Sequence, residues 1–177
     1  FFFLFINKYF FDRKYYIMML EDQLRNFPFF AKLGAFSIMQ NNPKKILETI
    51  NYSANILARE KNSILVMFPQ GEMRPDFERP IKAFQGIRKI IEKYGSELNL
   101  LTLGIKTVFL KEELPHVFYR FGENHIVSKD NNIETDDLAA EIRENLDMIE
   151  SSIIDGDTGK IIFSGKHSVS KKYQDKR

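Results

Sequence analysis

The sequence contains no cysteine and no tryptophan, and only three of its 177 residues are histidine. The lack of cysteine excludes disulfides and thiolate chemistry from this chain, and it is compatible with a reducing compartment. No glycine-rich phosphate loop follows a predicted strand, so the common nucleotide-binding motifs are absent. The histidines are scattered and have no cysteine beside them, which gives no support to a metal site. The sequence therefore predicts no metal and no cofactor.

A large excess of charge of one sign is also missing, because the formal net charge is only +2. This balance gives no argument for nucleic acid as a partner. The charges are unevenly placed, with acids dominating residues 130–157 and bases dominating residues 160–177. We therefore predict an α/β domain over residues 1–155 and a basic tail over residues 156–177. A solvated terminus is the simpler interpretation of the tail, and attraction to an anionic membrane surface is the alternative.

No run approaches the ~20 apolar residues that a transmembrane helix needs. The chain opens with the apolar run Phe1–Ile6, and its first methionine is Met18, inside a predicted strand. The opening run has neither the basic lead nor the small-residue cleavage site of a signal peptide. We interpret it as a helix packed in the core, with an aromatic membrane-facing surface as the alternative. The missing initiator methionine indicates that the sequence is truncated at its amino end.

Along the rest of the chain, short apolar segments alternate with segments of helical periodicity. The predicted strands cover residues 14–19, 35–39, 63–68, 98–105 and 117–121, and the predicted helices cover residues 21–33, 43–59, 83–94 and 136–149. The first helix is expected to be interrupted near Pro28. Asn42 is the expected N-cap of the second, with Pro43 at its first position, and Gly95 is the expected end of the third. This order predicts an α/β fold, a single domain with a mostly parallel sheet flanked by helices.

Two predictions concern burial. The strand over residues 63–68 is rich in β-branched and long apolar residues, which is typical of a strand that is covered on both faces. In the helix predicted over residues 83–94, the apolar positions recur at helical spacing and are expected to face the core. These positions are Phe84, Ile87, Ile90 and Ile91.

The most informative stretch is Phe-Pro-Gln-Gly-Glu-Met-Arg-Pro, which runs from Phe68, the last residue of the predicted strand, to Pro75. Pro69 and Gly71 cannot continue a strand, so polar side chains collect at the strand's carboxyl end. Ligands bind at this edge in open α/β sheets, because the loops that leave parallel strands line a crevice there. The alternative is a surface turn without a function.

Four segments occur in order: Gly-Ala-Phe-Ser-Ile at 34–38, Ile-Leu-Val-Met-Phe-Pro-Gln-Gly at 64–71, Lys-Ala-Phe-Gln-Gly at 82–86 and Leu-Leu-Thr-Leu-Gly-Ile at 100–105. Together they resemble the lysophospholipid acyltransferase family, which includes the 1-acylglycerol-3-phosphate acyltransferases. The resemblance covers about residues 15–105 and implies a glycerolipid acyltransferase-like fold.

The resemblance implies transfer of a fatty acyl group from acyl-CoA or acyl-carrier protein to a hydroxyl of a lysophospholipid or related lipid. It also implies a peripheral protein at the cytoplasmic face of a membrane. The residues that it assigns to substrate binding are Phe68, Pro69, Gln70, Gly71, Glu72, Arg74, Gly34 and Phe36.

The family resembled uses a His-x-x-x-x-Asp dyad ahead of these motifs, in which the imidazole deprotonates the acceptor hydroxyl and the carboxylate orients the imidazole. No such dyad precedes the turn in this sequence. The resemblance therefore places it upstream of Phe1, and the chain itself is expected to be inactive. His125 and Asp130 have the same spacing but follow the turn, in a polar segment that is predicted to be a loop, and we predict that they are not catalytic. His116 and His167 are predicted to be ordinary surface residues.

The sequence departs from the family pattern where the family binds the acceptor's phosphate. The family's Phe-Pro-Glu-Gly-Thr-Arg is Phe-Pro-Gln-Gly-Glu-Met here, with the arginine one place later at Arg74. The arginine that ends the family's Gly-x-x-Phe-Ile-x-Arg motif is replaced by Gln40. Because a guanidinium binds phosphate through two parallel hydrogen bonds, its loss argues against a lysophosphatidate acceptor. A less anionic lipid with a hydroxyl, such as a glycosylated or amino-acid lipid, is expected, unless Arg74, Arg79 and Lys82 compensate.

Two other classes of function are open. One is a non-catalytic acyltransferase-like domain that binds a lipid or a partner, and it predicts that the complete gene also lacks the dyad. The other is an unrelated α/β module in which the turn is only structural. That module predicts no acyl-chain groove beside the turn.

Overall fold

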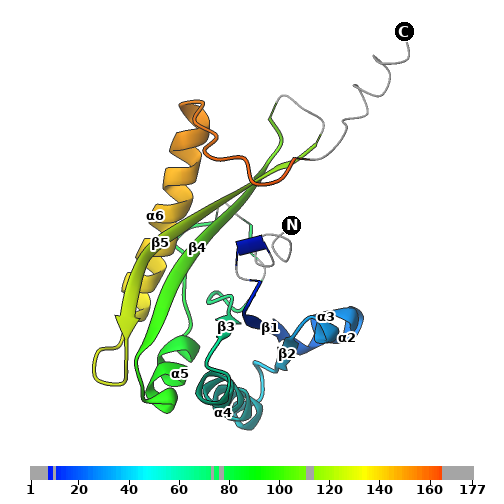
Figure 1. The fold of residues 1–177 in the computed structure, drawn as a ribbon, viewed down its shortest axis with the longest axis vertical. Coiled ribbons are helices and arrows are strands. Elements are labelled where there is room, and N and C mark those ends of the chain that lie inside the picture. Colours follow the sequence, from blue (N-terminus) through cyan, green and yellow to red (C-terminus); the bar gives the residue numbers. More distant parts are fainter. Residues whose placement is uncertain (1–7, 10, 73, 76–77, 111–113, 165–177) are drawn as a thin grey trace.

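In the computed structural model, β1 (Lys14–Leu20) lies between β2 (Ala35–Ile38) and β3 (Ser63–Val66) in a three-stranded parallel sheet (Figure 1). Ile17 of β1 is level with the start of β2 on one side and with the end of β3 on the other. The strands are therefore staggered, and β1 and β2 extend beyond the point where β3 ends.

The structure describes residues 8–9, 11–72, 74–75, 78–110 and 114–164. These residues form a single α/β domain, as the sequence predicts. The helix predicted over Phe1–Ile6 lies outside the described residues, as does most of the predicted basic tail. The described part of that tail, residues 156–164, contains no helix or strand.

Helices connect the parallel strands. α2 (Glu21–Asn26) and α3 (Phe29–Lys32) link β1 to β2 and are separated near Pro28, as predicted. α4 (Pro43–Arg59) links β2 to β3. The side chain of Asn42 accepts a hydrogen bond from the backbone N–H of Lys45 at 3.2 Å, which confirms it as the N-cap.

The core of this half of the molecule lies between the sheet and two helices. Met18 of β1, Ile50 of α4 and Ile90 of α5 (Gly86–Tyr94) are buried together. Half-buried apolar side chains surround them, namely Phe36, Ile38, Ile46, Leu57, Leu65 and Met67. Burying this much apolar surface stabilises the fold and fixes where the loops after β2 and β3 emerge.

The prediction that β3 is covered on both faces is wrong. All four of its residues are only half buried, and β1 is its one strand partner among the described residues. An edge strand has one neighbouring strand instead of two. Its side chains are therefore less buried than the apolar composition of β3 suggests.

The helix predicted from residue 83 begins later, at Gly86. Phe84 does not face the core, since 59% of it is exposed. Its backbone N–H donates to the carbonyl oxygen of Pro69 at 2.8 Å, so this segment is held against the preceding turn instead of in a helix. Ile90 and Ile91 are buried as predicted, and Gly95 ends the helix in the left-handed conformation.

β4 (Leu98–Val108) and β5 (His116–Val127) pair with each other as a long antiparallel ribbon, separate from the parallel sheet. The predicted mostly parallel sheet is therefore confirmed only for β1, β2 and β3. α6 (Thr135–Ile154) packs along one face of the ribbon, with Leu138 and Ile149 buried (Figure 1). No helix in the described part of the chain combines the length and the apolar composition that would let it cross a bilayer.

Candidate functional site

The segment after β3 forms a tight turn. The backbone N–H of Gly71 donates to the carbonyl oxygen of Phe68 at 3.0 Å. Pro69 and Gly71 occupy the second and fourth positions, where proline and glycine are favoured in the commonest type of β-turn. The backbone of Gly71 has a φ of 70°, which L side chains rarely adopt. The local sequence therefore specifies this turn.

Gln40, two residues after the end of β2, fixes the turn. Its Nε2 donates to the carbonyl oxygen of Gly71 at 2.5 Å. A Cβ at Gly71 would overlap this Nε2 and would lie 2.8 Å from the ring of Phe84. The side chain of Gln40 therefore holds the turn, at the position that the resemblance aligns with an arginine of the family.

Two exposed phenylalanines lie beside the turn. Phe68 is 60% exposed and Phe84 is 59% exposed. The hydrogen bond between the backbones of Phe84 and Pro69 brings the segment before α5 against the turn. This part of the surface therefore presents apolar side chains next to the polar residues Gln70 and Glu72.

Arg74 is not free for a ligand in this structure. Its guanidinium donates to the carboxylate of Glu72 and, at 2.8 Å, to that of Glu78. The hydrogen bond and charge of Glu72, followed by the charge of Glu78, raise the pKa of Arg74. Arg79 lies 3.7 Å from a carboxylate oxygen of Asp147. A phosphate at either arginine would have to displace these carboxylates.

The described contacts of Gly34 and Phe36 are with β1 and α4 and not with the turn. Gly34 precedes β2, has a φ of 87°, and accepts a hydrogen bond at its carbonyl oxygen from the N–H of Ile17 at 3.1 Å. The ring of Phe36 meets that of Tyr52 in α4 edge-on, with centroids 5.0 Å apart. Phe36 and Tyr52 line a small groove of about 330 Å³ between β2 and α4. Gly34 therefore has a structural role at the start of β2, and Phe36 is part of the wall of this groove.

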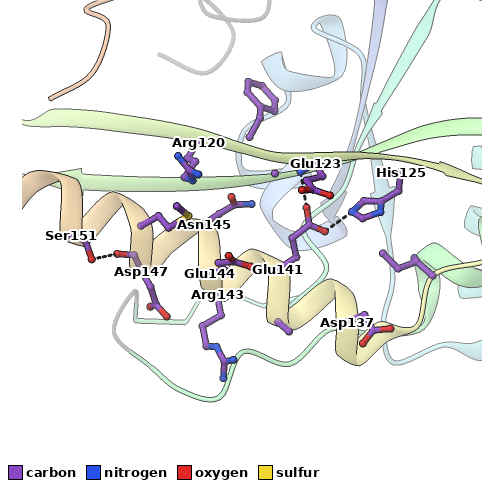
Figure 2. Close-up of a pocket in the computed structure, with 15 residues that line it drawn as sticks. Arg120, Glu123, His125, Asp137, Glu141, Arg143, Glu144, Asn145, Asp147 and Ser151 are labelled. Carbon is purple, nitrogen blue, oxygen red and sulfur yellow. Dashed lines mark hydrogen bonds and ion pairs between the residues drawn. The ribbon is translucent and has the colours of Figure 1, made fainter. Parts of the chain in front are cut away.

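A larger groove of about 1010 Å³ lies between β5 and α6, and it contains His125 (Figure 2). The Nε2 atom of His125 lies 2.8 Å from Oε2 of Glu141. Oε1 of Glu141 accepts hydrogen bonds from the hydroxyl of Thr102 at 2.8 Å and from the N–H of Glu123 at 3.0 Å. The carboxylate that holds His125 is thus Glu141 and not Asp130.

His125 lies on a strand, so the prediction that it belongs to a polar loop is wrong; the loop begins after Val127. His116 also lies on β5 and is half buried, with its Nδ1 buried and without a hydrogen-bond partner among the described residues. It is therefore not the ordinary surface residue predicted. His167 lies outside the described residues.

No model of a known protein family, no curated protein and no solved structure matches this chain. The resemblance to lysophospholipid acyltransferases therefore rests on the sequence segments, and the structure adds the contacts among them. Within the described residues, no group of three or more His, Asp or Glu side chains could hold a metal ion.

Sequence reasoning missed two residues of these sites. Gln40 was recognised only as a replaced arginine, although an amide at that position can donate to a nearby carbonyl. Glu141 lies on the helical face that α6 turns toward the ribbon, 16 residues from His125. The only sign of this pair in the sequence was the helical spacing that places Glu141 on the inward face of α6. That spacing does not show which residue of the ribbon the carboxylate contacts.

Proposed function

We propose that this protein is an O-acyltransferase related to the lysophospholipid acyltransferases, with a glycerolipid acyltransferase-like fold, acting at the cytoplasmic face of a membrane. The observation that carries the proposal is the meeting of three segments that bear the resemblance. Gln40 is the last residue of the motif at 34–40 that contains the first of these segments, Gly71 ends the second, and Phe84 belongs to the third. Their contacts join the end of β2, the turn after β3 and the approach to α5 into one surface.

In the proposed reaction, the oxygen of a lipid hydroxyl attacks the thioester carbonyl of acyl-CoA or acyl-carrier protein. A carbon–oxygen ester bond forms, the carbon–sulfur bond breaks and the thiol leaves with a proton. A general base must take the proton of the hydroxyl. The resemblance implies that a His-x-x-x-x-Asp dyad supplies this base, and the turn and its neighbours would supply the acceptor site.

Phe68 and Phe84 give that acceptor site an apolar wall. Each side chain is more than half exposed, and covering a phenylalanine completely contributes roughly 1.5–3 kcal/mol. A fatty acyl chain could supply the cover. Gln70 and Glu72 lie on the same turn and would face the polar part of the lipid.

The charges favour an acceptor without a phosphate at the reacting end. The side-chain amide of Gln40 donates a hydrogen bond to Gly71, and Arg74 forms ion pairs with Glu72 and Glu78. A glycosylated or amino-acid lipid offers hydroxyls that do not need a guanidinium. If phosphate is bound after all, simultaneous replacement of Arg74, Arg79 and Lys82 by alanine should abolish the preference for it.

We expect the protein expressed from its complete reading frame to transfer labelled acyl groups to such lipids, and Gln40→Ala to lower the rate by about tenfold or more. Without the amide of Gln40 the turn loses its hydrogen bond and can shift. A shift of about 1 Å in a group that positions the substrate lowers the reaction rate by up to ~100-fold. Gln23→Ala, which removes an amide from α2, is the matched control. Transfer would be measured by thin-layer chromatography with monoacylglycerol, a glycosylated lipid and lysophosphatidate as acceptors.

Transfer that Gln40→Ala leaves unchanged would refute the acceptor site at the turn. Complete absence of transfer, together with lipid binding that depends on Phe68 and Phe84, would favour the non-catalytic binding domain. Absence of both would favour a module whose turn is only structural.

A further inference from the structure

Arg120 of β5 lines the groove between β5 and α6, and no described side chain pairs with it. The residue is half buried. Its Nε atom is buried and has no hydrogen-bond partner among the described residues. A buried donor without an acceptor costs free energy, and one explanation for it in a folded protein is a bound ion or ligand. Arg120 is therefore a candidate anchor for an anion.

The register of the ribbon explains why Arg120 has no partner on β4. Arg120 lies opposite Gly104, and directly opposite residues of an antiparallel pair share a face. Gly104 has no side chain that could accept a hydrogen bond. The helix approaches closely here, since a Cβ at Gly104 would lie 3.1 Å from the Cβ of Asn145. The ribbon thus holds Arg120 on the face toward α6 without offering it an acceptor.

The carboxylates on the neighbouring part of α6 pair with other cations. Glu150 lies 2.5 Å from the Nζ of Lys106 and 3.8 Å from the guanidinium of Arg79. Arg79 also lies 3.7 Å from Asp147, which lines the groove together with Arg120. These two acids therefore already have partners in the chain, and a different anion is needed to neutralise Arg120.

The same groove carries carboxylates that have no partner. Glu123 of β5 and Asp137 and Glu144 of α6 line it. None of these three carboxylates has a hydrogen bond or an ion pair among the described residues. They would repel a ligand whose only charge is negative. A ligand that also carries a cationic group would be attracted both to them and to Arg120.

The two kinds of charge lie at different places along the groove. Five residues of β5 separate Arg120 from His125, which is about 15 Å at the rise of a strand. Asp137 lies on α6 at the His125 end of the groove, and Asp147 lies toward the other end (Figure 2). A ligand that meets both kinds of charge must therefore be longer than a free α-amino acid, whose two charges are adjacent.

We propose that the groove between β5 and α6 binds a small dipolar molecule, with its carboxylate at Arg120 and its ammonium group among the three unpaired carboxylates. A guanidinium binds a carboxylate through two parallel hydrogen bonds, and the buried Nε of Arg120 would donate one of them. The groove, at about 1010 Å³, is large enough for such a ligand. This site is separate from the turn after β3 and does not depend on acyl transfer.

The probe is ω-aminooctanoate, with octanoate and octylamine as matched molecules that each lack one of its charges. Binding to the full chain would be followed by nuclear magnetic resonance through the Nε–H signal of Arg120, assigned by its absence from the Arg120→Gln variant. We expect ω-aminooctanoate to shift this signal. It should bind about threefold or more tightly than either matched molecule, because each of those lacks one ion pair.

Arg120→Gln is expected to weaken the binding of ω-aminooctanoate by about tenfold or more, because the charge-assisted hydrogen bonds to the carboxylate are lost. Arg59→Gln is the matched control, since it removes the same charge from an exposed position at the end of α4, and it should leave the binding unchanged. Arg120 makes no side-chain hydrogen bond to the described residues, so Arg120→Gln should not lower the thermal midpoint.

Asp137→Asn with Glu144→Gln tests the cationic end of the ligand. This double variant should weaken the binding of ω-aminooctanoate by about threefold or more, because two of the carboxylates that face the ammonium group are neutralised. It should not weaken the binding of octanoate, which has no ammonium group.

An Nε–H signal of Arg120 that ω-aminooctanoate does not move would overturn the proposal, as would equal binding by Arg120→Gln and Arg59→Gln. Octanoate that binds as tightly as ω-aminooctanoate would contradict the dipolar ligand, and a larger shift with inorganic phosphate would contradict the carboxylate. A failure of acyl transfer would count against the proposed function alone, because these measurements follow binding at a different place.

Discussion

Replacing Gly34 by alanine is expected to lower the free energy of unfolding by about 3 kcal/mol. A Cβ there would overlap the backbone carbonyl oxygen of Tyr15, which cannot rotate away as a side chain could. The left-handed conformation at φ 87° adds about 1–2 kcal/mol for a residue with a Cβ, and the hydrogen bond from Ile17 to Gly34 is worth about 1 kcal/mol. Relief of the overlap would separate β2 from β1, where the two strands begin to pair.

Gly95→Ala is the matched control for this prediction. Gly95 has a similar φ of 76°, but a Cβ there would meet no atom within 4 Å. Its replacement should therefore cost only the conformational strain, about 1 kcal/mol. Urea denaturation followed by circular dichroism measures both variants, and equal losses would show that the close approach of Gly34 to β1 has no energetic weight.

Glu141→Leu is expected to destabilise the protein by about 2–3 kcal/mol. Glu141 is 17% exposed at its side chain, and its carboxylate accepts hydrogen bonds from Thr102 and from the backbone of Glu123 while it contacts His125. Thr102 is 4% exposed, so its hydroxyl proton would lose its acceptor in a place that water reaches poorly. A buried polar group left without a partner costs about 1–3 kcal/mol.

Two variants make this prediction specific. Glu141→Gln keeps a carbonyl oxygen for Thr102 and Glu123 and should cost no more than about 1 kcal/mol. Glu144→Leu removes an exposed carboxylate from the next turn of α6 and should change stability by less than about 0.5 kcal/mol. If Glu141→Leu and Glu144→Leu have the same thermal midpoint, the network does not hold α6 on the ribbon.

Local chemistry determined the parts of the fold that the sequence predicted well. Asn42 and Pro43 start α4, Gly95 ends α5, and Pro28 interrupts the helical segment before β2. Each of these effects depends on a residue and its immediate neighbours in the chain. A single sequence contains that information.

Pairing between distant segments was not predictable in the same way. The apolar segment that became β4 could equally have joined the parallel sheet, but it pairs with β5, whose residues lie after it in the chain. Phe84 fits the helical spacing of Ile87, but its backbone N–H is hydrogen-bonded to the carbonyl oxygen of Pro69 and it lies outside the helix. The apolar pattern says that a side chain prefers burial and does not say which segment will cover it.

The same limit applies to the candidate site. The turn from Phe68 to Gly71 was predictable because proline and glycine restrict the backbone directly. The contact of Gln40 with Gly71 joins residues 31 positions apart, and that of His125 with Glu141 joins residues on a strand and a helix. In neither case did the sequence predict the contact itself.

The measurement that tests the acceptor site most directly is photocrosslinking with a lysolipid that carries a diazirine in its acyl chain. Trypsin releases the turn within residues 62–82, because Arg74 and Arg79 both precede proline, and it releases Phe84 within residues 83–88. We predict that the label is found on these two peptides and that unlabelled lipid competes for it. Label concentrated on residues 121–143, which line the groove between β5 and α6, would contradict an acceptor site at the turn.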